Sequence, residues 1–137
     1  MANKNPFNRI VDWNNERGII DKGYDHVNET SFIIEELLEG TCDVESKKAN
    51  KIAKGLAKVL NLFKVDMAKE KMVDAFCDII VFATGAIAKL GYDPNKAMNE
   101  TLKEIEDRTG KMIDGKFVKD KKENAYKADY SKCLLKD

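Results

Sequence analysis

Carboxylates recur at helical spacing in two stretches of the sequence. The first, FIIEELLEG, contains Glu35, Glu36 and Glu39, and the second, VDAFCDIIVFA, contains Asp74 and Asp78. Residues three or four apart share one face of a helix, so each stretch would present its acids together. Mg²⁺ binds carboxylate oxygens in near-octahedral geometry. Two facing helices that each offer a pair of acids could therefore hold such a cation.

The position of Asp78 favours a metal ligand. From Ala75 to Ala83 all residues except Asp78 are apolar, so the run is typical of a buried helix. A charge in an apolar interior is costly unless it is paired or binds a metal. The alternatives are an Asp78 bonded to Lys, Arg or a hydroxyl of another helix, and an EELLE cluster that is only a solvated helix face. The two clusters together favour the metal.

Composition limits the remaining possibilities. The 137 residues fit one domain, and a formal net charge of zero excludes a generic polyanion binder. The charge is uneven, because residues 108–137 hold nine Lys or Arg and five Asp or Glu. Three scattered cysteines and a single histidine, His26, exclude a zinc site of the usual spacing and a di-iron bundle with paired Glu-x-x-His motifs.

Apolar periodicity predicts helices almost throughout. They cover about residues 7–17, 25–39, 45–63, 67–90 and 93–108, and Gly40 is expected to end the second. Asp93 and Pro94 form a good N-terminus for the fifth. Beyond it, residues 109–137 form a basic C-terminal arm, either extended or with a small hairpin at Asp114-Gly115. The fold class is therefore all-α, an antiparallel bundle of about five helices in one domain over residues 1–137.

The first residues lack the apolar core of a signal peptide, and the apolar run after Met72 is too short to span a membrane. We therefore expect a cytoplasmic protein without a membrane partner.

The combination of EExxE, the acid pair in VDAFCDIIVF and the following GYD resembles the MazG-like all-α NTP pyrophosphohydrolases. This group is related to dimeric dUTPases and phosphoribosyl-ATP pyrophosphatases. WNNERG near the start and AMNETLKEIEDRTGKMIDGKFVKD near the end are similar to its phage and bacterial branch, so the resemblance covers most of the chain. The family's second motif is usually ExxD, whereas here Asp74 and Asp78 are four apart and position 75 is Ala.

The resemblance implies a Mg²⁺-dependent enzyme, with Mn²⁺ as a substitute, that cleaves nucleoside triphosphates between the α and β phosphates. Its site would be completed in a homodimer or homotetramer. The metal ligands would be Glu36, Glu39, Asp74 and Asp78. Glu35 would be an additional catalytic acid near the attacking water, alongside Glu39.

Polar residues after the second acid cluster are candidates for contacts with the nucleotide. A triphosphate needs positive donors, since Mg²⁺ neutralises only part of its charge. The candidate substrate-binding residues after this cluster are Asn99, Lys103, Arg108 and Lys111. Asn14, near the start of the chain, is a further candidate, because its amide could read an edge of the base. The alternative for each base is a solvated surface position. A non-catalytic helical binding module whose basic tail contacts nucleic acid or a partner protein is the alternative function, although the balanced net charge disfavours nucleic acid.

Overall fold

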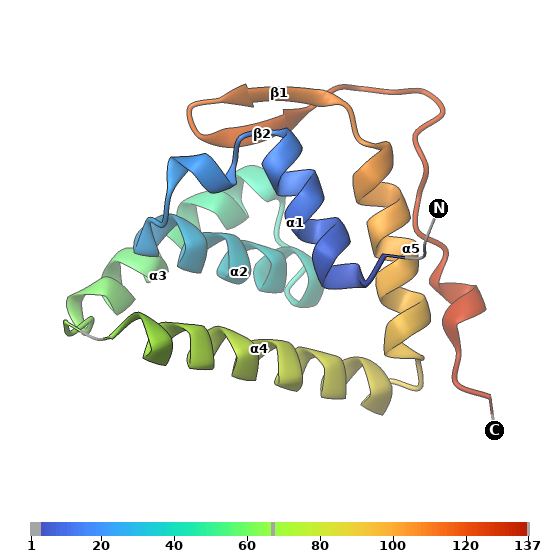
Figure 1. Ribbon diagram of the computed structural model, residues 1–137, viewed down its shortest axis with the longest axis horizontal. Coiled ribbons are helices and arrows are strands. Elements are labelled where there is room, and N and C mark those ends of the chain that lie inside the picture. Colours follow the sequence, from blue (N-terminus) through green and yellow to red (C-terminus); the bar gives the residue numbers. More distant parts are fainter. Residues whose placement is uncertain (1–3, 67, 137) are drawn as a thin grey trace. The chain divides into compact units, whose positions relative to one another are not determined.

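The computed structural model describes residues 4–66 and 68–136, and these are mostly helical (Figure 1). The helices of the described ranges are α1 (Pro6–Glu16), α2 (His26–Thr41), α3 (Ser46–Leu62), α4 (Lys69–Lys89) and α5 (Pro94–Asp107). Two short 3₁₀ helices, η1 (Ile20–Lys22) and η2 (Tyr130–Cys133), and a pair of strands, β1 (Gly110–Ile113) and β2 (Lys116–Lys119), complete the elements. The predicted all-α class is confirmed.

The contacts within the chain group into two compact units. One contains Met1–Lys22 with Lys69–Asp137, and the other contains Gly23–Ala68. The expectation of one domain over residues 1–137 stays a prediction. In the described part of the chain, no helix has the length and apolar character needed to cross a membrane.

The smaller unit is an antiparallel pair of helices, α2 and α3, joined by a short loop. Its core is a row of alanines on α3, Ala49, Ala53 and Ala57, whose side chains are fully buried. Because alanine is small, the row lets the two backbones approach closely. The larger apolar residues of α3 stay exposed, among them Leu56 at 45% and Val59 at 51% exposure.

The end of α2 corrects one expectation. Gly40 was expected to end the helix, but the helix continues through Thr41. Asp43 takes the left-handed conformation instead, with φ of 53°. The amide of Val44 can then donate to the carbonyl of Leu38 over 3.2 Å. An aspartate tolerates this conformation better than most residues, so the helix ends without its glycine.

In the larger unit, α1 lies beside α5 and runs in the same direction (Figure 1). The Arg9 guanidinium forms a two-pronged ion pair with Glu106, with Nε–Oε1 and Nη2–Oε2 distances of 2.7 and 2.8 Å. Higher on α1, the indole nitrogen of Trp13 donates to the carbonyl of Ile105 over 3.0 Å. Asp93 caps α5 by accepting from the second and third backbone amides of the helix, as expected from its sequence.

A hairpin follows α5. Asp114 and Gly115, with φ of 49° and 80°, form its two-residue turn, which confirms the hairpin alternative. The Trp13 ring meets Phe117 of β2 edge-on, with centroids 5.1 Å apart. At Gly110 an added Cβ would meet the carbonyl oxygen of Val118 and would lie 2.8 Å from Cζ of Phe117, so only glycine fits there.

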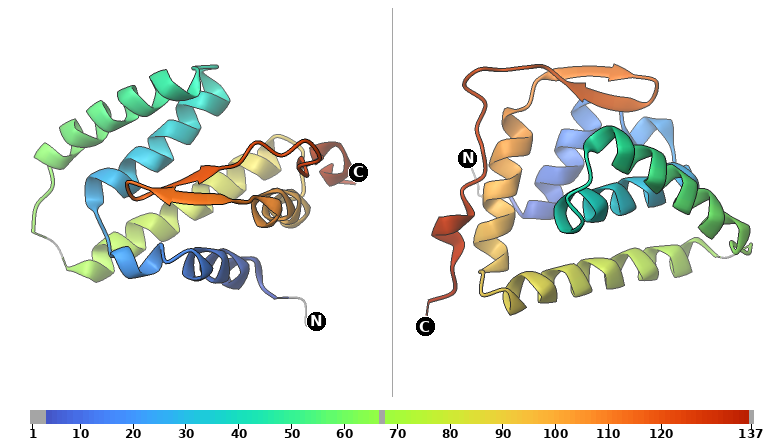
Figure 2. Two further views of the ribbon diagram at one scale, coloured as in Figure 1. Left: turned by 90° about the horizontal axis from the view of Figure 1, so that it is seen from above. Right: turned by 180° about the vertical axis from the view of Figure 1, so that it is seen from behind.

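After the hairpin the chain returns along α5 in the opposite direction (Figure 2). The amide of Asp93 donates to the carbonyl of Cys133 over 2.7 Å, and Leu135 donates to Gly91 over 2.9 Å. Cys133 is buried, together with Leu102 of α5. The C-terminal arm is thus an ordered part of the larger unit.

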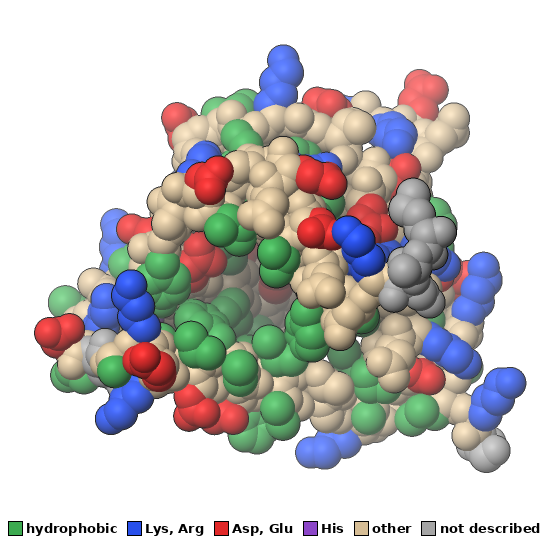
Figure 3. Space-filling model, in the orientation of Figure 1, with side chains coloured by type: hydrophobic (Ala, Val, Ile, Leu, Met, Phe, Trp, Pro, Cys, Tyr) green, Lys and Arg blue, Asp and Glu red, His purple; other side chains and the backbone are tan. Residues whose placement is uncertain are grey.

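Helix α4 meets α5 near the N-terminal end of α5, and it has no buried residue. Its apolar side chains are open, with Phe82 at 76% and Val81 at 65% exposure, and they gather along the helix in Figure 3. The expectation that the run Ala75–Ala83 is buried core is therefore wrong for the single chain. The periodicity indicates a helix, but it does not require that a neighbour within the same chain covers it.

Candidate functional site

The acids of α2 differ in their surroundings. Glu35 is buried and faces α3, where Nδ2 of Asn50 donates to its Oε2 over 3.0 Å. Glu36 is exposed and Glu39 is half-buried. The helix places Glu36 and Glu39 on one face, three residues apart, as predicted. Glu35 lies on the inner face of the helix pair instead, where it accepts the hydrogen bond from Asn50.

A further acid of α2 was missed in the sequence. Glu29 is half-buried, and burial together with the nearby charge of Asp25 raises the pKa of its carboxyl. It precedes Glu36 by seven residues, so the two occupy nearly the same face two turns apart. The spacing was visible in the sequence, but the loss of solvent around Glu29 was not.

The acids of α4 lie on an open surface. Asp74 and Asp78 are both exposed and are one helical turn apart on the same face. Because Asp78 is exposed, burial within its own chain does not require a cation or a base to compensate its charge. What remains unusual is its setting, because Asp78 is flanked by exposed apolar side chains, among them Ile79 at 43% and Ile80 at 45% exposure.

The donor chemistry of these residues fits magnesium. Carboxylate oxygens are the hard ligands that Mg²⁺ and Mn²⁺ prefer. Glu36 and Glu39 would supply one pair and Asp74 and Asp78 the other, each pair from a single helix. Over residues 4–66 and 68–136, no three His, Cys, Asp or Glu side chains gather into a ready cation cage. The two pairs belong to different units of the chain.

The predicted substrate-binding residues all belong to the larger unit, and most already have partners. Nη1 of Arg9 donates to the side-chain oxygen of Asn99 over 2.9 Å. Nδ2 of Asn14 donates to the carbonyl of Ile10 over 2.9 Å. Lys111 is exposed on β1.

Lys103 and Arg108 are ion-paired on their own helix. Nζ of Lys103 lies 2.7 Å from Glu100, and Nη2 of Arg108 lies 3.3 Å from Glu104. A nucleotide would have to compete with these contacts or add to them. The structure brings Asn99 and Lys103 onto α5, whereas Arg108 and Lys111 lie beyond the opposite end of that helix from α4 (Figure 1).

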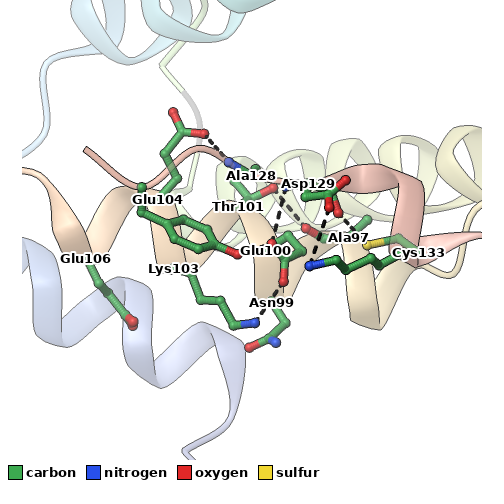
Figure 4. Close-up of polar contacts among 12 residues, drawn as sticks. Ala97, Asn99, Glu100, Thr101, Lys103, Glu104, Glu106, Ala128, Asp129 and Cys133 are labelled. Carbon is green, nitrogen blue, oxygen red and sulfur yellow. Dashed lines mark hydrogen bonds and ion pairs between the residues drawn. The ribbon is translucent and has the colours of Figure 1, made fainter. Parts of the chain in front are cut away.

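The most extensive polar network of the larger unit is one that the sequence did not suggest. Glu100, Glu104 and Asp107, which share one face of α5, accept hydrogen bonds from backbone amides of the returning segment. Figure 4 shows the contacts of Glu100 and Glu104. Asp107 accepts from the Tyr126 amide over 2.7 Å and Glu104 from the Ala128 amide over 2.9 Å. The three carboxylates thereby accept hydrogen bonds from backbone amides of this segment, as the carbonyls of a neighbouring strand do in a sheet.

These contacts hold the carboxyls in their charged form. The ammonium of Lys103, the hydroxyl of Tyr126 and the amide of Asp129 lower the pKa of Glu100 from 4.5 to about 2. The Ala128 amide, followed by Arg108, lowers the pKa of Glu104. Hydrogen bonding to an ionised carboxylate favours the charged form, which is the cause in both cases.

The cavities that the described residues line include two on the larger unit. An apolar one of about 400 Å³ lies between the end of α4, α5 and η2, where the hydroxyls of Thr101 and Tyr130 are 2.9 Å apart. Another of about 440 Å³, lined by many charged residues, lies at the C-terminal end of α5 under the segment that follows β2.

Comparison with protein-family models, curated proteins and solved structures finds no match to this chain.

Proposed function

We propose that the protein is a Mg²⁺-dependent nucleotide pyrophosphohydrolase that converts a nucleoside triphosphate to the monophosphate and pyrophosphate. The observation that carries the proposal is the pair of exposed acids, Asp74 and Asp78, one turn apart on a helix whose surface is otherwise largely apolar. A helix that only needed solubility would gain little from placing both acids on one face. A cation-binding surface needs that placement.

The second acid pair fits the same role. Glu36 and Glu39 share a face of α2, and together with Asp74 and Asp78 they would supply four carboxylates to the metal. When bound, Mg²⁺ would polarise phosphoryl oxygens and lower the pKa of a coordinated water. Glu35 and Glu39 would be the acids that orient the water or take its proton.

Positive and amide side chains of the larger unit would bind the substrate. Asn99 and Lys103 lie on α5, and their present partners, Arg9 and Glu100, hold them in fixed positions. Arg108 and Lys111 would contribute from the end of α5 and from β1, and Asn14 from α1. Donors fixed in advance stabilise the charge on the leaving pyrophosphate without having to reorganise.

The apolar surface of α4 supports a homodimer or homotetramer. No residue of α4 is buried, although Phe82, Val81 and Ile80 are 76%, 65% and 45% exposed. Contiguous apolar surface of this kind marks an interaction site. A second copy that covers α4 would remove apolar surface from water around Asp78, and in that setting a cation would compensate the two aspartates. We place the enzyme in the cytoplasm.

The test is a pyrophosphate-release assay with the common ribonucleoside and deoxyribonucleoside triphosphates, each with Mg²⁺ and with EDTA. Release that requires Mg²⁺ and is abolished by EDTA is the expected result. If none of the triphosphates yields pyrophosphate while the protein binds single-stranded DNA or RNA in a salt-sensitive manner, the proposal is overturned in favour of a binding module.

A further inference from the structure

The cavity at the C-terminal end of α5 is lined by more positive than negative side chains. The segment from Lys119 to Lys127 leaves the hairpin, turns and rejoins α5, and it encloses about 440 Å³. Volumes of this size are typical of sites for small molecules. The lining contains three acids, Glu104, Asp107 and Asp120, and five bases, Arg108, Lys119, Lys121, Lys122 and Lys127.

Two of the three acids are already engaged. Glu104 accepts from the Ala128 amide and from Arg108, at 2.9 and 3.3 Å. Asp107 accepts from the Tyr126 amide over 2.7 Å and from Nζ of Lys122 over 3.0 Å. These pairs balance Arg108 and Lys122 within the wall of the cavity. Their contacts also fix the wall in place, because each acid joins α5 to the returning segment.

Three lysines remain against one acid. Within the described ranges 4–66 and 68–136, Lys119, Lys121 and Lys127 form no ion pair, and Asp120 is the third acid of the lining. The balance at this cavity is therefore about two positive charges in excess. Like charges held near one another repel, and a bound anion removes that cost.

We propose that this cavity binds a small phosphate-bearing anion, of which pyrophosphate is the probe with the best charge match. A phosphate group offers acceptor oxygens on every side, and lysine ammonium groups bind it as point charges. The walls include the last turn of α5 and the backbone at Tyr126, whose amide is held by Asp107, so this part of the cavity is fixed in place.

The site is separate from the proposed metal ligands of the same unit. Helix α4, which bears Asp74 and Asp78, joins α5 at the N-terminal end of α5, and the cavity lies at the other end (Figure 1). A helix of 14 residues is about 21 Å long. Arg108 lines the cavity and is also a proposed substrate-binding residue, but Lys119, Lys121 and Lys127 have no part in the proposed catalysis. The proposal rests on these three lysines, so it and the catalytic function can fail independently.

The experiment measures binding without metal, so that the carboxylate pairs of α2 and α4 cannot contribute. The full chain in EDTA and low salt is titrated with sodium pyrophosphate, by calorimetry and by amide chemical shifts in ¹⁵N-labelled protein. We expect one pyrophosphate per chain, shifts centred on residues 119–127, and weaker binding as salt rises.

Two matched triple variants separate a site from a general charge effect. K119Q/K121Q/K127Q should weaken pyrophosphate binding by at least about tenfold, because three charge-assisted contacts are lost. The control, K47Q/K51Q/K58Q, removes the same charge from exposed positions of α3 and should stay within about twofold. Equal losses in the two variants, or no binding by the parent chain, would overturn the proposal.

The source of the phosphate is tested in the same titration. Orthophosphate and a nucleoside monophosphate should bind at the same lysines with lower affinity than pyrophosphate, since they carry less charge. A single-stranded oligonucleotide that binds more tightly than pyrophosphate, and that loses its binding in K119Q/K121Q/K127Q, would show a nucleic-acid surface in place of a small-anion site and would overturn the assignment.

Discussion

The carboxylate network of α5 makes the stability of the larger unit depend on pH in a calculable way. In the folded chain Lys103, Tyr126 and the Asp129 amide lower the pKa of Glu100 to about 2, from 4.5. Because the folded state holds this proton less readily, its stabilising contribution is present above pH about 5 and is lost as the pH falls through about 2. The larger unit should therefore become easier to unfold as the pH falls through that range.

The magnitude follows from the two pKa values. At pH 3 a carboxyl of pKa 4.5 is about 97% protonated and one of pKa about 2 is about 9% protonated, so unfolding takes up about 0.9 proton at this group alone. The unfolding equilibrium constant should then rise about eightfold for each unit by which the pH falls. Glu104 and Asp107, whose pKa values are also lowered, would steepen the dependence.

The assay is urea unfolding at closely spaced pH values from 2.5 to 6, followed by the fluorescence of Trp13, which packs against Phe117 in the same unit. In a plot of the logarithm of the unfolding equilibrium constant against pH, Glu100→Gln should make the slope near pH 3 less steep by about 0.9. Glu123→Gln changes an exposed acid of the same segment and should leave the slope as it is in the parent. A Glu100→Gln protein with the parental slope would refute the assignment of the network.

Three further predictions concern other parts of the chain. Phe82→Glu, which places a charge on the exposed face of α4, should reduce the mass measured by light scattering from that of a dimer or tetramer to that of a monomer. The control Lys89→Glu should leave the mass unchanged. A parent protein that is already a monomer would contradict the interface. Ala53→Leu should destabilise the α2–α3 contact, where Ala53 is fully buried, by about 1–3 kcal/mol in urea unfolding. Gly55→Ala, whose added Cβ meets only open space, should stabilise the chain by about 0.5–1 kcal/mol. Equal effects of the two substitutions would show that α3 does not pack through its alanines. Gly110→Ala should cost about 1–3 kcal/mol and should shift the β2 amide resonances, since its Cβ would clash with the backbone of β2; an unshifted hairpin spectrum would contradict that close approach.

The sequence predicted the helices well because apolar periodicity is a local property. The N-terminus of α5 at Asp93-Pro94 and the turn at Asp114-Gly115 were also readable, since capping and turn residues act within a few positions. Gly40 misled because glycine permits a helix end without requiring one, and Asp43 took the left-handed position instead.

Which face a helix buries was less predictable, because the answer depends on the neighbour. In α3 the buried residues are small alanines rather than the larger apolar positions, and in α4 no residue is buried. Periodicity alone cannot tell whether the apolar face of a helix is buried within the chain or exposed. The exposure of Asp78 follows from this, so its metal-binding role stays a prediction that rests on spacing and on resemblance.

That the C-terminal arm is ordered could not be predicted from the sequence, for another reason. The arm is polar and lacks periodicity, so the sequence indicated an irregular tail. Its backbone amides are bound by Glu100, Glu104 and Asp107, which recur four and three residues apart on α5. Acids at such spacing usually face solvent, and only the path of the returning chain shows that they have a partner.

The central claim, that Asp78 is a magnesium ligand of a nucleotide pyrophosphohydrolase, is tested most directly by one comparison of rates. Pyrophosphate release from the preferred triphosphate is measured with Mg²⁺ for the parent, for Asp78→Asn and for Asp66→Asn, an exposed acid just before α4. We predict that Asp78→Asn loses at least about 100-fold in rate with its helical content intact, while Asp66→Asn keeps the parental rate. An Asp78→Asn protein as active as the parent would contradict the account.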